Sequence, residues 1–168
     1  MPKAKIDYSN ERQGALGGTY RRRLDDAFRA LDAINVGKLP PEVAFVFYFL
    51  ACVKIAKVMV GISRGRPGRG TVFSNMKWHC SDVIRAAKHI RCGALVSDDD
   101  IKNIFAGERV TLFSANAIRN RLVHDFGPTH VIEARTHGPR LIKAMQRFLE
   151  CRTPIISILD GRPEAAKV

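Results

Sequence analysis

The feature that most constrains the fold is the apolar run Val43–Val53, VAFVFYFLACV, which Lys54 and Lys57 then interrupt. A helix over this segment is apolar on almost every side, so other elements must surround it. The eleven residues of the run are too few to cross a membrane, which takes roughly 20 apolar residues. Pro40-Pro41 suits the first turn of a helix. The run therefore predicts a buried central helix over about residues 41–60 and no membrane partner.

Helical periodicity also appears on both sides of this run. Apolar residues recur at the spacing of a helix over residues 19–36, 74–91 and 136–151. Ser97 and the acids after it have the pattern of a cap residue and an acidic first turn, which predicts a short helix that ends near Gly107. Together these segments predict an all-α protein, a bundle of four long helices plus one short helix.

The composition along the chain divides it into three parts. Residues 1–18 are polar, contain glycine and show little periodicity, so we expect a flexible arm. Residues 19–152 hold the helical domain. Residues 153–168 form a C-terminal tail, in which Pro154–Asp160 (PIISILD) is interpreted as a short strand or an extended segment.

The chain carries a large excess of positive charge. Its 28 Lys and Arg residues against 16 Asp and Glu residues give a net charge of +12. Such an excess favours a polyanionic partner, which is a nucleic acid, an acidic protein or an anionic membrane. A basic surface without any partner has the same composition, and the charge says nothing about the fold.

The cysteine and histidine spacings give no sign of a metal site. Cys52, Cys80, Cys92 and Cys151 form no CxxC pair and do not have the spacing of a zinc clamp. The sequence contains no phosphate-binding loop and none of the common hydrolase motifs. No long apolar segment follows the N-terminal lysines. We therefore expect a cytoplasmic protein with free, buried thiols and no cofactor.

Residues Arg119 to His124, with the sequence RNRLVH, contain groups that suffice to cleave a phosphodiester without a metal. An imidazole with a pKa near neutrality can move a proton. A guanidinium can hold a phosphate in a bidentate fork, and the amide of Asn120 can orient either group. Arg119, Asn120 and His124 are therefore the candidate catalytic residues. A solvated helix end is the alternative interpretation, because histidine near a helix C-terminus is favourable with the helix dipole.

The motif lies on a predicted helix over about residues 109–125. At about 100° per residue, the apolar residues of this helix share one arc, which predicts the face toward the core: Leu112, Ala115, Ile118, Leu122 and Phe126. Asn116, Asn120 and His124 stack on a separate face. Arg119 lies about 140° from His124. A second copy of the helix would bring the two together better, so we expect a homodimer with the site at its interface.

The segment RNRLVH resembles the Arg-x4–6-His signature of the HEPN superfamily, including the polar residue after the arginine. The layout is also similar over about residues 110–150. The resemblance implies an all-α HEPN-like bundle, usually dimeric and often a metal-independent endoribonuclease, with Arg119, Asn120 and His124 as functional residues. Such proteins act in toxin–antitoxin, anti-phage and RNA-processing systems, and some are not catalytic.

The same resemblance bears on possible partners. A toxin role implies an antitoxin or a nucleotidyltransferase as the cognate partner. HEPN toxins paired with nucleotidyltransferases often have a tyrosine two residues after the histidine, and this chain has Phe126 there. A switch that works by modifying that tyrosine is therefore unavailable to this chain.

Basic side chains outside the catalytic motif are candidate nucleic-acid ligands. Arg64-Gly65-Arg66-Pro67 resembles the core of an AT-hook, which enters the DNA minor groove when it is free and extended. In a short loop between two helices, the same arginines suit contacts with RNA phosphates or with solvent alone. We expect Arg64, Arg66, Arg69 and Arg121 to contribute to nucleic-acid binding.

The leading functional hypothesis is a homodimeric HEPN-type endoribonuclease that cleaves RNA by attack of the 2′-hydroxyl. Two alternatives stay open. One is a non-catalytic HEPN-like module that binds RNA or a protein. The other is a basic helical protein that associates with DNA through the Arg66 loop.

Overall fold

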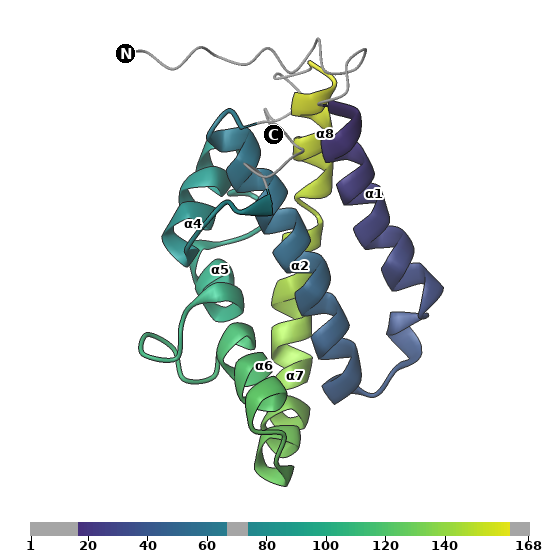
Figure 1. Ribbon diagram of the computed structural model, residues 1–168, viewed down its shortest axis with the longest axis vertical. Coiled ribbons are helices and arrows are strands. Elements are labelled where there is room, and N and C mark those ends of the chain that lie inside the picture. The colour runs from purple at the N-terminus through teal and green to yellow at the C-terminus, as the bar shows by residue number, and fades with distance from the viewer. Residues whose placement is uncertain (1–16, 67–73, 162–168) are drawn as a thin grey trace.

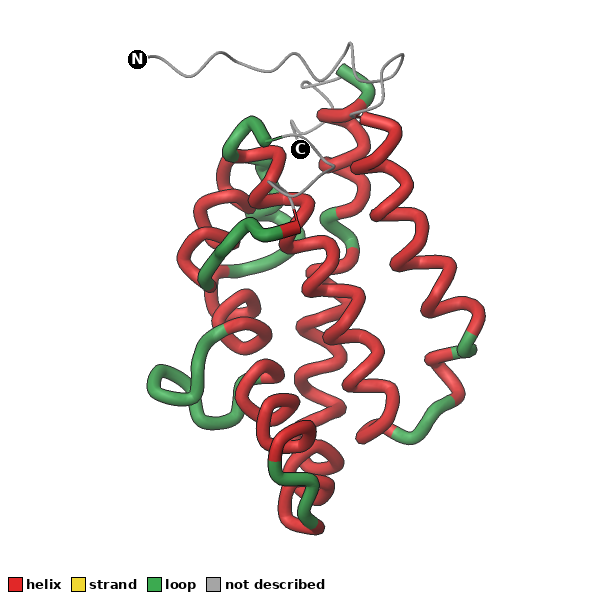
Figure 2. Tube along the Cα trace, viewed as in Figure 1, coloured by secondary structure: helices red, strands yellow, loops and turns green. Residues whose placement is uncertain are grey.

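The computed structural model describes residues 17–66 and 74–161, and these residues form helices and no strand (Figures 1 and 2). The all-α class expected from the sequence is confirmed. The elements are α1 (Gly17–Ala33), the 3-10 helix η2 (Val36–Lys38), α2 (Pro41–Ser63), α4 (Cys80–His89), α5 (Asp98–Phe105), α6 (Ala115–His124), α7 (Pro128–Leu149) and α8 (Arg152–Leu159).

Helix α2 is the centre of the bundle, as its all-round apolar sequence predicts. It packs along α7 and also contacts α1 and α4 (Figure 1). Phe45 and Ile55 on α2, and Phe148 on α7, are fully buried in this core. The two helices approach closely where α2 begins, since a Cβ on Gly138 would lie 3.4 Å from the carbonyl oxygen of Pro41. A Cβ there would already be in van der Waals contact with the start of α2.

Helix α2 begins where the sequence predicts and extends three residues past the predicted end at about residue 60. It has 23 residues, and by length and composition alone it could cross a membrane. Most of it is instead buried inside the protein, as in the core helix of a bundle. Lys57 keeps its charged end at the surface, where Nζ donates to the carbonyl oxygen of Ser74 at 3.0 Å. A long lysine stem can lie along apolar surface in this way, so the helix continues past it.

Several predicted helix boundaries are wrong because local capping decides them. Helix α4 begins at Cys80, not near Ser74, because the carboxylate of Asp82 accepts a hydrogen bond from the backbone N–H of His79 at 2.7 Å and closes a capping box. Helix α7 begins at Pro128, eight residues before the predicted start at 136. Pro139 therefore lies inside α7, where the sequence had indicated a first turn.

The C-terminal segment interpreted as a strand or tail is a helix. Helix α8 lies beside α1 (Figure 1) and buries Ile155 and Leu159, which are one helical turn apart. The guanidinium of Arg152 pairs with Asp25 at 2.9 Å and lies 4.4 Å from the centre of the Phe28 ring. The helical domain thus extends from Gly17 to Leu159. Residues 1–16 of the expected arm and residues 162–168 lie outside the described part of the chain.

The four cysteines are free thiols, and three of them are buried, as expected. The thiol of Cys52 lies 3.6 Å from the carbonyl oxygen of Met145, and burial raises its pKa well above the usual value. Hydrogen bonding to Cys92, together with burial, raises the pKa of Cys151 as well. These thiols stay protonated and serve the core as small apolar groups.

Candidate active site

Helix α6, which carries the motif, begins later than the sequence indicates. Ser114 is fully buried and caps the helix: its Oγ accepts a hydrogen bond from the N–H of Ala117 at 3.0 Å. The same hydroxyl donates to the carbonyl oxygen of Ala106 at 2.7 Å. The cap thus closes residues 106–114 into a loop, here called the α5–α6 loop. Residues 109–114 belong to that loop and not to the predicted helix 109–125.

The face of α6 toward the core is rotated from the predicted arc. Ala115 and Ile118 are buried as expected, but Leu112 and Phe126 are 52% and 79% exposed. Both lie beyond the ends of α6, so helical periodicity does not apply to them. Ala117 is buried in their place. On this helix Arg119 and Asn120 are half-buried, and His124 is exposed.

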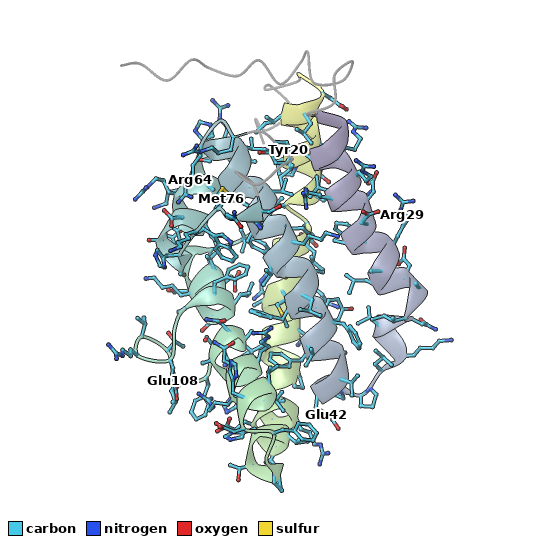
Figure 3. The ribbon with its side chains drawn as sticks, viewed as in Figure 1. Tyr20, Arg29, Glu42, Arg64, Met76 and Glu108 are labelled. Carbon is cyan, nitrogen blue, oxygen red and sulfur yellow. The ribbon has the colours of Figure 1, made fainter. Side chains whose placement is uncertain are left out.

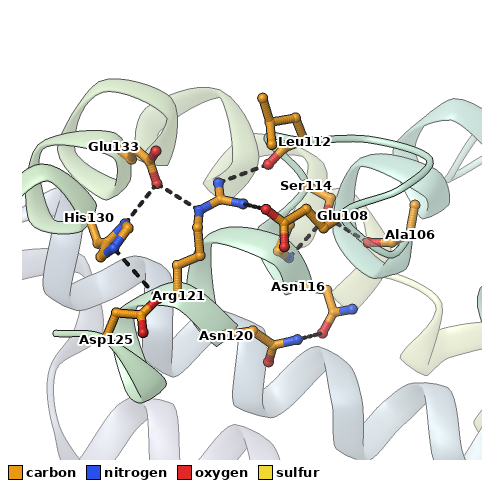
Figure 4. Close-up of polar contacts among 11 residues, drawn as sticks. Ala106, Glu108, Leu112, Ser114, Asn116, Asn120, Arg121, Asp125, His130 and Glu133 are labelled. Carbon is orange, nitrogen blue, oxygen red and sulfur yellow. Dashed lines mark hydrogen bonds and ion pairs between the residues drawn. The ribbon is translucent and has the colours of Figure 1, made fainter. Parts of the chain in front are cut away.

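Hydrogen bonds connect three side chains of α6, those of Arg119, Asn120 and Asn116. Arg119 Nη1 donates to Asn120 Oδ1 at 3.0 Å. Asn120 Nδ2 donates to Asn116 Oδ1 at 3.5 Å, as Figure 4 shows. Asn116 Nδ2 in turn donates to the carbonyl oxygen of Phe105, at the end of α5, at 3.5 Å. The predicted stacking of Asn116 and Asn120 is confirmed. Each of these side chains is half-buried, so the Arg119 guanidinium is held from one side while its other donors stay accessible.

His124 is exposed at the last residue of α6. Among the residues that the structure describes, it makes no hydrogen bond and no ion pair. Five residues separate it from Arg119, which corresponds to about 140° around the helix. The structure therefore does not bring His124 and Arg119 together within one chain. An exposed imidazole without a partner is available to a ligand.

Arg121 belongs to a different network from the catalytic candidates. Its side chain is 12% exposed and pairs with Glu133 at 3.0 Å and with Glu108 at 3.1 Å. Nη2 also donates to the carbonyl oxygen of Leu112 at 2.8 Å. In Figure 4 the guanidinium lies between the α5–α6 loop and α7. Arg121 was predicted to bind nucleic acid, but its donors are committed to holding α6, α7 and the loop together.

A second imidazole stands next to this network. His130 Nδ1 lies 3.5 Å from Glu133 Oε2, and His130 Nε2 lies 3.8 Å from Asp125 Oδ2 (Figure 4). Sequence reasoning did not single out His130, because its partners are on the α6–α7 turn and on α7. The two carboxylates orient this ring, whereas His124 is oriented by nothing in the described chain.

The basic loop after α2 lies near the opposite end of the bundle from α6 (Figures 1 and 3). Arg64 is engaged there, since Nη1 donates to the carbonyl oxygen of Lys77 at 2.7 Å and Nη2 lies 3.3 Å from Asp82. Arg66 is exposed, and its carbonyl oxygen accepts a hydrogen bond from Tyr20. Arg69 falls outside the described residues. Arg64 and Arg66 therefore lie apart from the catalytic candidates within a chain.

No family model, no curated protein and no solved structure matches the chain. The assignment of function therefore depends on the residues themselves. Within residues 17–66 and 74–161, no group of three or more His, Cys, Asp or Glu side chains is placed to hold a metal ion. Ser97 caps α5 and the aspartates after it lie in the first turn, as expected; Asp100 completes the capping box. Asp100 also pairs with Arg147 at 2.7 Å, and this pairing is the main cause that lowers the pKa of Asp100.

Exposed apolar side chains beside the motif are the feature that sequence reasoning missed. Val123 lies on α6 between Arg119 and Asn120 in angle, and it is 57% exposed. Phe126 follows on the α6–α7 turn, and Ile132 is exposed on the first turns of α7. Phe126 has a φ of 36°, in the left-handed region that bulky residues rarely adopt. Such strain persists only where the surrounding structure imposes it.

Proposed function

We propose that the protein is a HEPN-type endoribonuclease that cleaves RNA without a metal at a site shared by two copies of the chain. The observation that carries the proposal is the exposed face of α6. There, an anchored guanidinium and amide lie on the same helix as an imidazole that has no partner in the described chain. The strongly basic composition agrees with a polyanionic substrate.

The proposed reaction needs only the side chains of this face. His124 takes the proton of the 2′-hydroxyl as general base, and the 2′-oxygen attacks the adjacent phosphorus. The bond from phosphorus to the 5′-oxygen breaks, and that oxygen receives a proton from the imidazolium or from water. Arg119 binds the phosphate and stabilises the charge that develops on it. The products are a 2′,3′-cyclic phosphate and a 5′-hydroxyl.

Asn120 has a positioning role in this scheme. Its Oδ1 holds Arg119 at 3.0 Å, and its amide nitrogen is tied through Asn116 to the end of α5. The guanidinium therefore needs little reordering when a phosphate arrives, which lowers the entropic cost of binding.

A dimer supplies what one chain lacks. The separation of about 140° between Arg119 and His124 means that the two side chains converge poorly on one phosphate within a single chain. A second α6 related by twofold symmetry places His124 of one copy opposite Arg119 of the other. Val123, Phe126 and Ile132 would lose their exposure to water in such a contact, which favours association. If the protein is a toxin, this face is also the one that an antitoxin or a nucleotidyltransferase would need to cover.

The alternative with a specific observation behind it is a non-catalytic module that binds RNA. Asn120 and Arg119 already hydrogen bond to one another, which is also what a simple phosphate-binding surface would show. Binding to DNA through the Arg66 loop is less favoured, because Arg64 is committed to Asp82 and Lys77.

His124→Ala is the decisive variant. General acid–base groups contribute roughly 10²–10⁴-fold, so RNA cleavage should fall by that factor while RNA binding and helicity stay near the wild-type values. His89→Ala is the matched control, because His89 is likewise an exposed histidine at the last residue of a helix. Cleavage should also persist in excess chelator.

Three results would contradict this mechanism. Cleavage that survives in His124→Ala, or that stops with chelator, shows that the proposed chemistry is wrong. Wild-type protein that binds several RNAs but cuts none is instead a binding module. The cyclic phosphate product can be identified by its resistance to direct labelling of the 3′ end.

A further inference from the structure

Two aromatic rings stack at the surface beside the start of α6. The ring centroids of Phe113, in the α5–α6 loop, and His137, on α7, are 4.3 Å apart, and the ring planes differ by 16°. Phe113 is nevertheless 37% exposed, and His137 is half-buried. The pair thus presents aromatic surface to solvent instead of closing into the core. An aromatic surface of this kind can stack a nucleobase, because every base has a π-face.

The backbone that carries Phe113 is held in place from several sides. Arg140 Nη2 lies 3.5 Å from the carbonyl oxygen of Phe113, and Arg121 Nη2 binds the preceding carbonyl oxygen, that of Leu112, at 2.8 Å. The next residue, Ser114, is the buried cap of α6. Because the backbone is anchored and the ring is already stacked on His137, little freedom is lost when a ligand stacks on the pair.

The charge around the two rings suits a phosphate. Arg140 is exposed one turn after His137 on α7, and Lys143 is exposed one turn further on. Arg109 is exposed on the α5–α6 loop itself. Glu108 is the acidic residue of that loop, and its carboxylate is paired with Arg121. Positive charge therefore predominates next to an exposed ring, which is how single-stranded nucleic acid is commonly bound.

We propose that Phe113, His137 and Arg140 form a binding subsite for one nucleotide of single-stranded RNA. The base stacks on the exposed aromatic surface, and the guanidinium of Arg140 binds the adjoining phosphate. The proposal rests on RNA being the substrate of the proposed function, and it specifies the strand as unpaired. Bases inside a duplex already stack on one another, so they cannot take this position.

The subsite and His124 lie at the two ends of α6. The ten residues from Ser114 to His124 correspond to about 15 Å along the helix axis. Both lie toward the side of α6 that Arg121 occupies. His124 is about 60° around the helix from Arg121, and Arg121 binds the carbonyl oxygen of Leu112, next to Phe113. An extended RNA strand that follows α6 would therefore contact the subsite some nucleotides away from the bond that is cut. Binding there would fix the register of the strand and not the chemistry.

The test compares an unstructured RNA of about 20 nucleotides with the same strand in which a run of bases is replaced by abasic sites. Both are measured by fluorescence anisotropy on His124→Ala protein, so that the RNA stays intact. Loss of one base–aromatic stack should weaken binding by about 5- to 150-fold. Phe113→Leu should show this loss on the intact strand, and Phe113→Tyr should restore the affinity. Leu50→Ala, which removes an exposed apolar side chain from α2, is the control and should not change binding.

The abasic strand isolates the stacking contact from any effect on folding. Wild-type Phe113 should distinguish the two strands, whereas Phe113→Leu should bind both with similar affinity. Arg140→Ala should reduce the slope of log affinity against log salt by about 0.7, the value for one phosphate contact on a single strand.

Equal binding of intact and abasic strands by protein that retains Phe113 overturns the subsite. A Phe113→Leu variant that keeps the full preference for the intact strand also overturns it. Cleavage by wild-type protein is measured separately on the same RNA. If cleavage occurs without the stacking effect, only the subsite fails; if stacking occurs without cleavage, only the proposed enzymatic function fails.

Discussion

Replacing Arg121 by alanine tests whether this residue holds the site together or binds the substrate. The sequence places it inside the motif, between Asn120 and His124, where a substrate contact is a natural expectation. In the structure its guanidinium joins α6 to α7 through Glu133, and to the α5–α6 loop through Glu108 and the carbonyl oxygen of Leu112. We expect Arg121→Ala to destabilise the fold rather than weaken a phosphate contact.

The size of the effect follows from the exposure of each partner. The Arg121 and Glu133 side chains are 12% and 21% exposed, and removing one partner of a buried pair costs about 3–5 kcal/mol. Because a fifth of Glu133 still meets water, about 2 kcal/mol is the better value. The pair with Glu108, whose side chain is 58% exposed, adds less than about 1 kcal/mol. With the lost hydrogen bond to Leu112, the total is about 3 kcal/mol.

Urea unfolding followed by circular dichroism measures this change directly. Arg85→Ala is the control, because Arg85 is an exposed arginine whose contact with Asp82 is 3.9 Å long, and its loss should cost less than about 0.5 kcal/mol. Replacing both Arg121 and Glu133 by leucine should recover most of the stability, since the charged partner then left without Arg121 is Glu108, which is largely exposed. If Arg121→Ala is as stable as the control, and the salt dependence of RNA binding becomes shallower, then Arg121 is a substrate ligand and the network described here is incidental.

Three further predictions follow from other parts of the fold. Val123→Asp should make the protein monomeric by light scattering and reduce cleavage; a dimer that survives this charge excludes the shared face. The pKa of Asp100 is lowered in the folded state, mainly by Arg147, so its stabilisation is present above the unfolded value near 4 and is lost as pH falls below it. Asp100→Asn should therefore flatten the decline of the urea midpoint between about pH 5 and 2. Leu159→Ala should cost about 2 kcal/mol if α8 packs on α1, whereas an extended tail would lose almost nothing.

Much of the architecture was readable from local sequence because the signals are strong and local. The apolar run after Pro41 could only be a helix surrounded by others, and α2 is that helix. Ser97 and the acids after it correctly predicted the residue at which α5 begins. The stacking of Asn116 on Asn120 followed from the four-residue spacing alone.

Predictions that depended on where a helix begins or ends were less successful. The apolar arc of α6 was drawn through Leu112 and Phe126, but Ser114 starts the helix and Asp125 ends it, so these two side chains point into solvent. Pro139 was assigned to the first turn of α7, although Pro128 already occupies that position. Helix ends depend on which cap and which packing partner prevails, and a short window of sequence does not contain that information.

The sequence by itself determined the all-α class and the central helix, and it predicted a group of residues for phosphodiester chemistry. These depend on spacing and side-chain type, which are local. Only the tertiary structure decided that Arg121 is turned inward, that α8 is a helix and that Phe113 meets His137. Each of these depends on residues far apart in the chain: Glu133 for Arg121, Asp25 for Arg152 in α8, and α7 for the α5–α6 loop. Contacts between residues far apart in the chain stabilise the protein only once the bundle has formed, so no local sequence pattern predicts them.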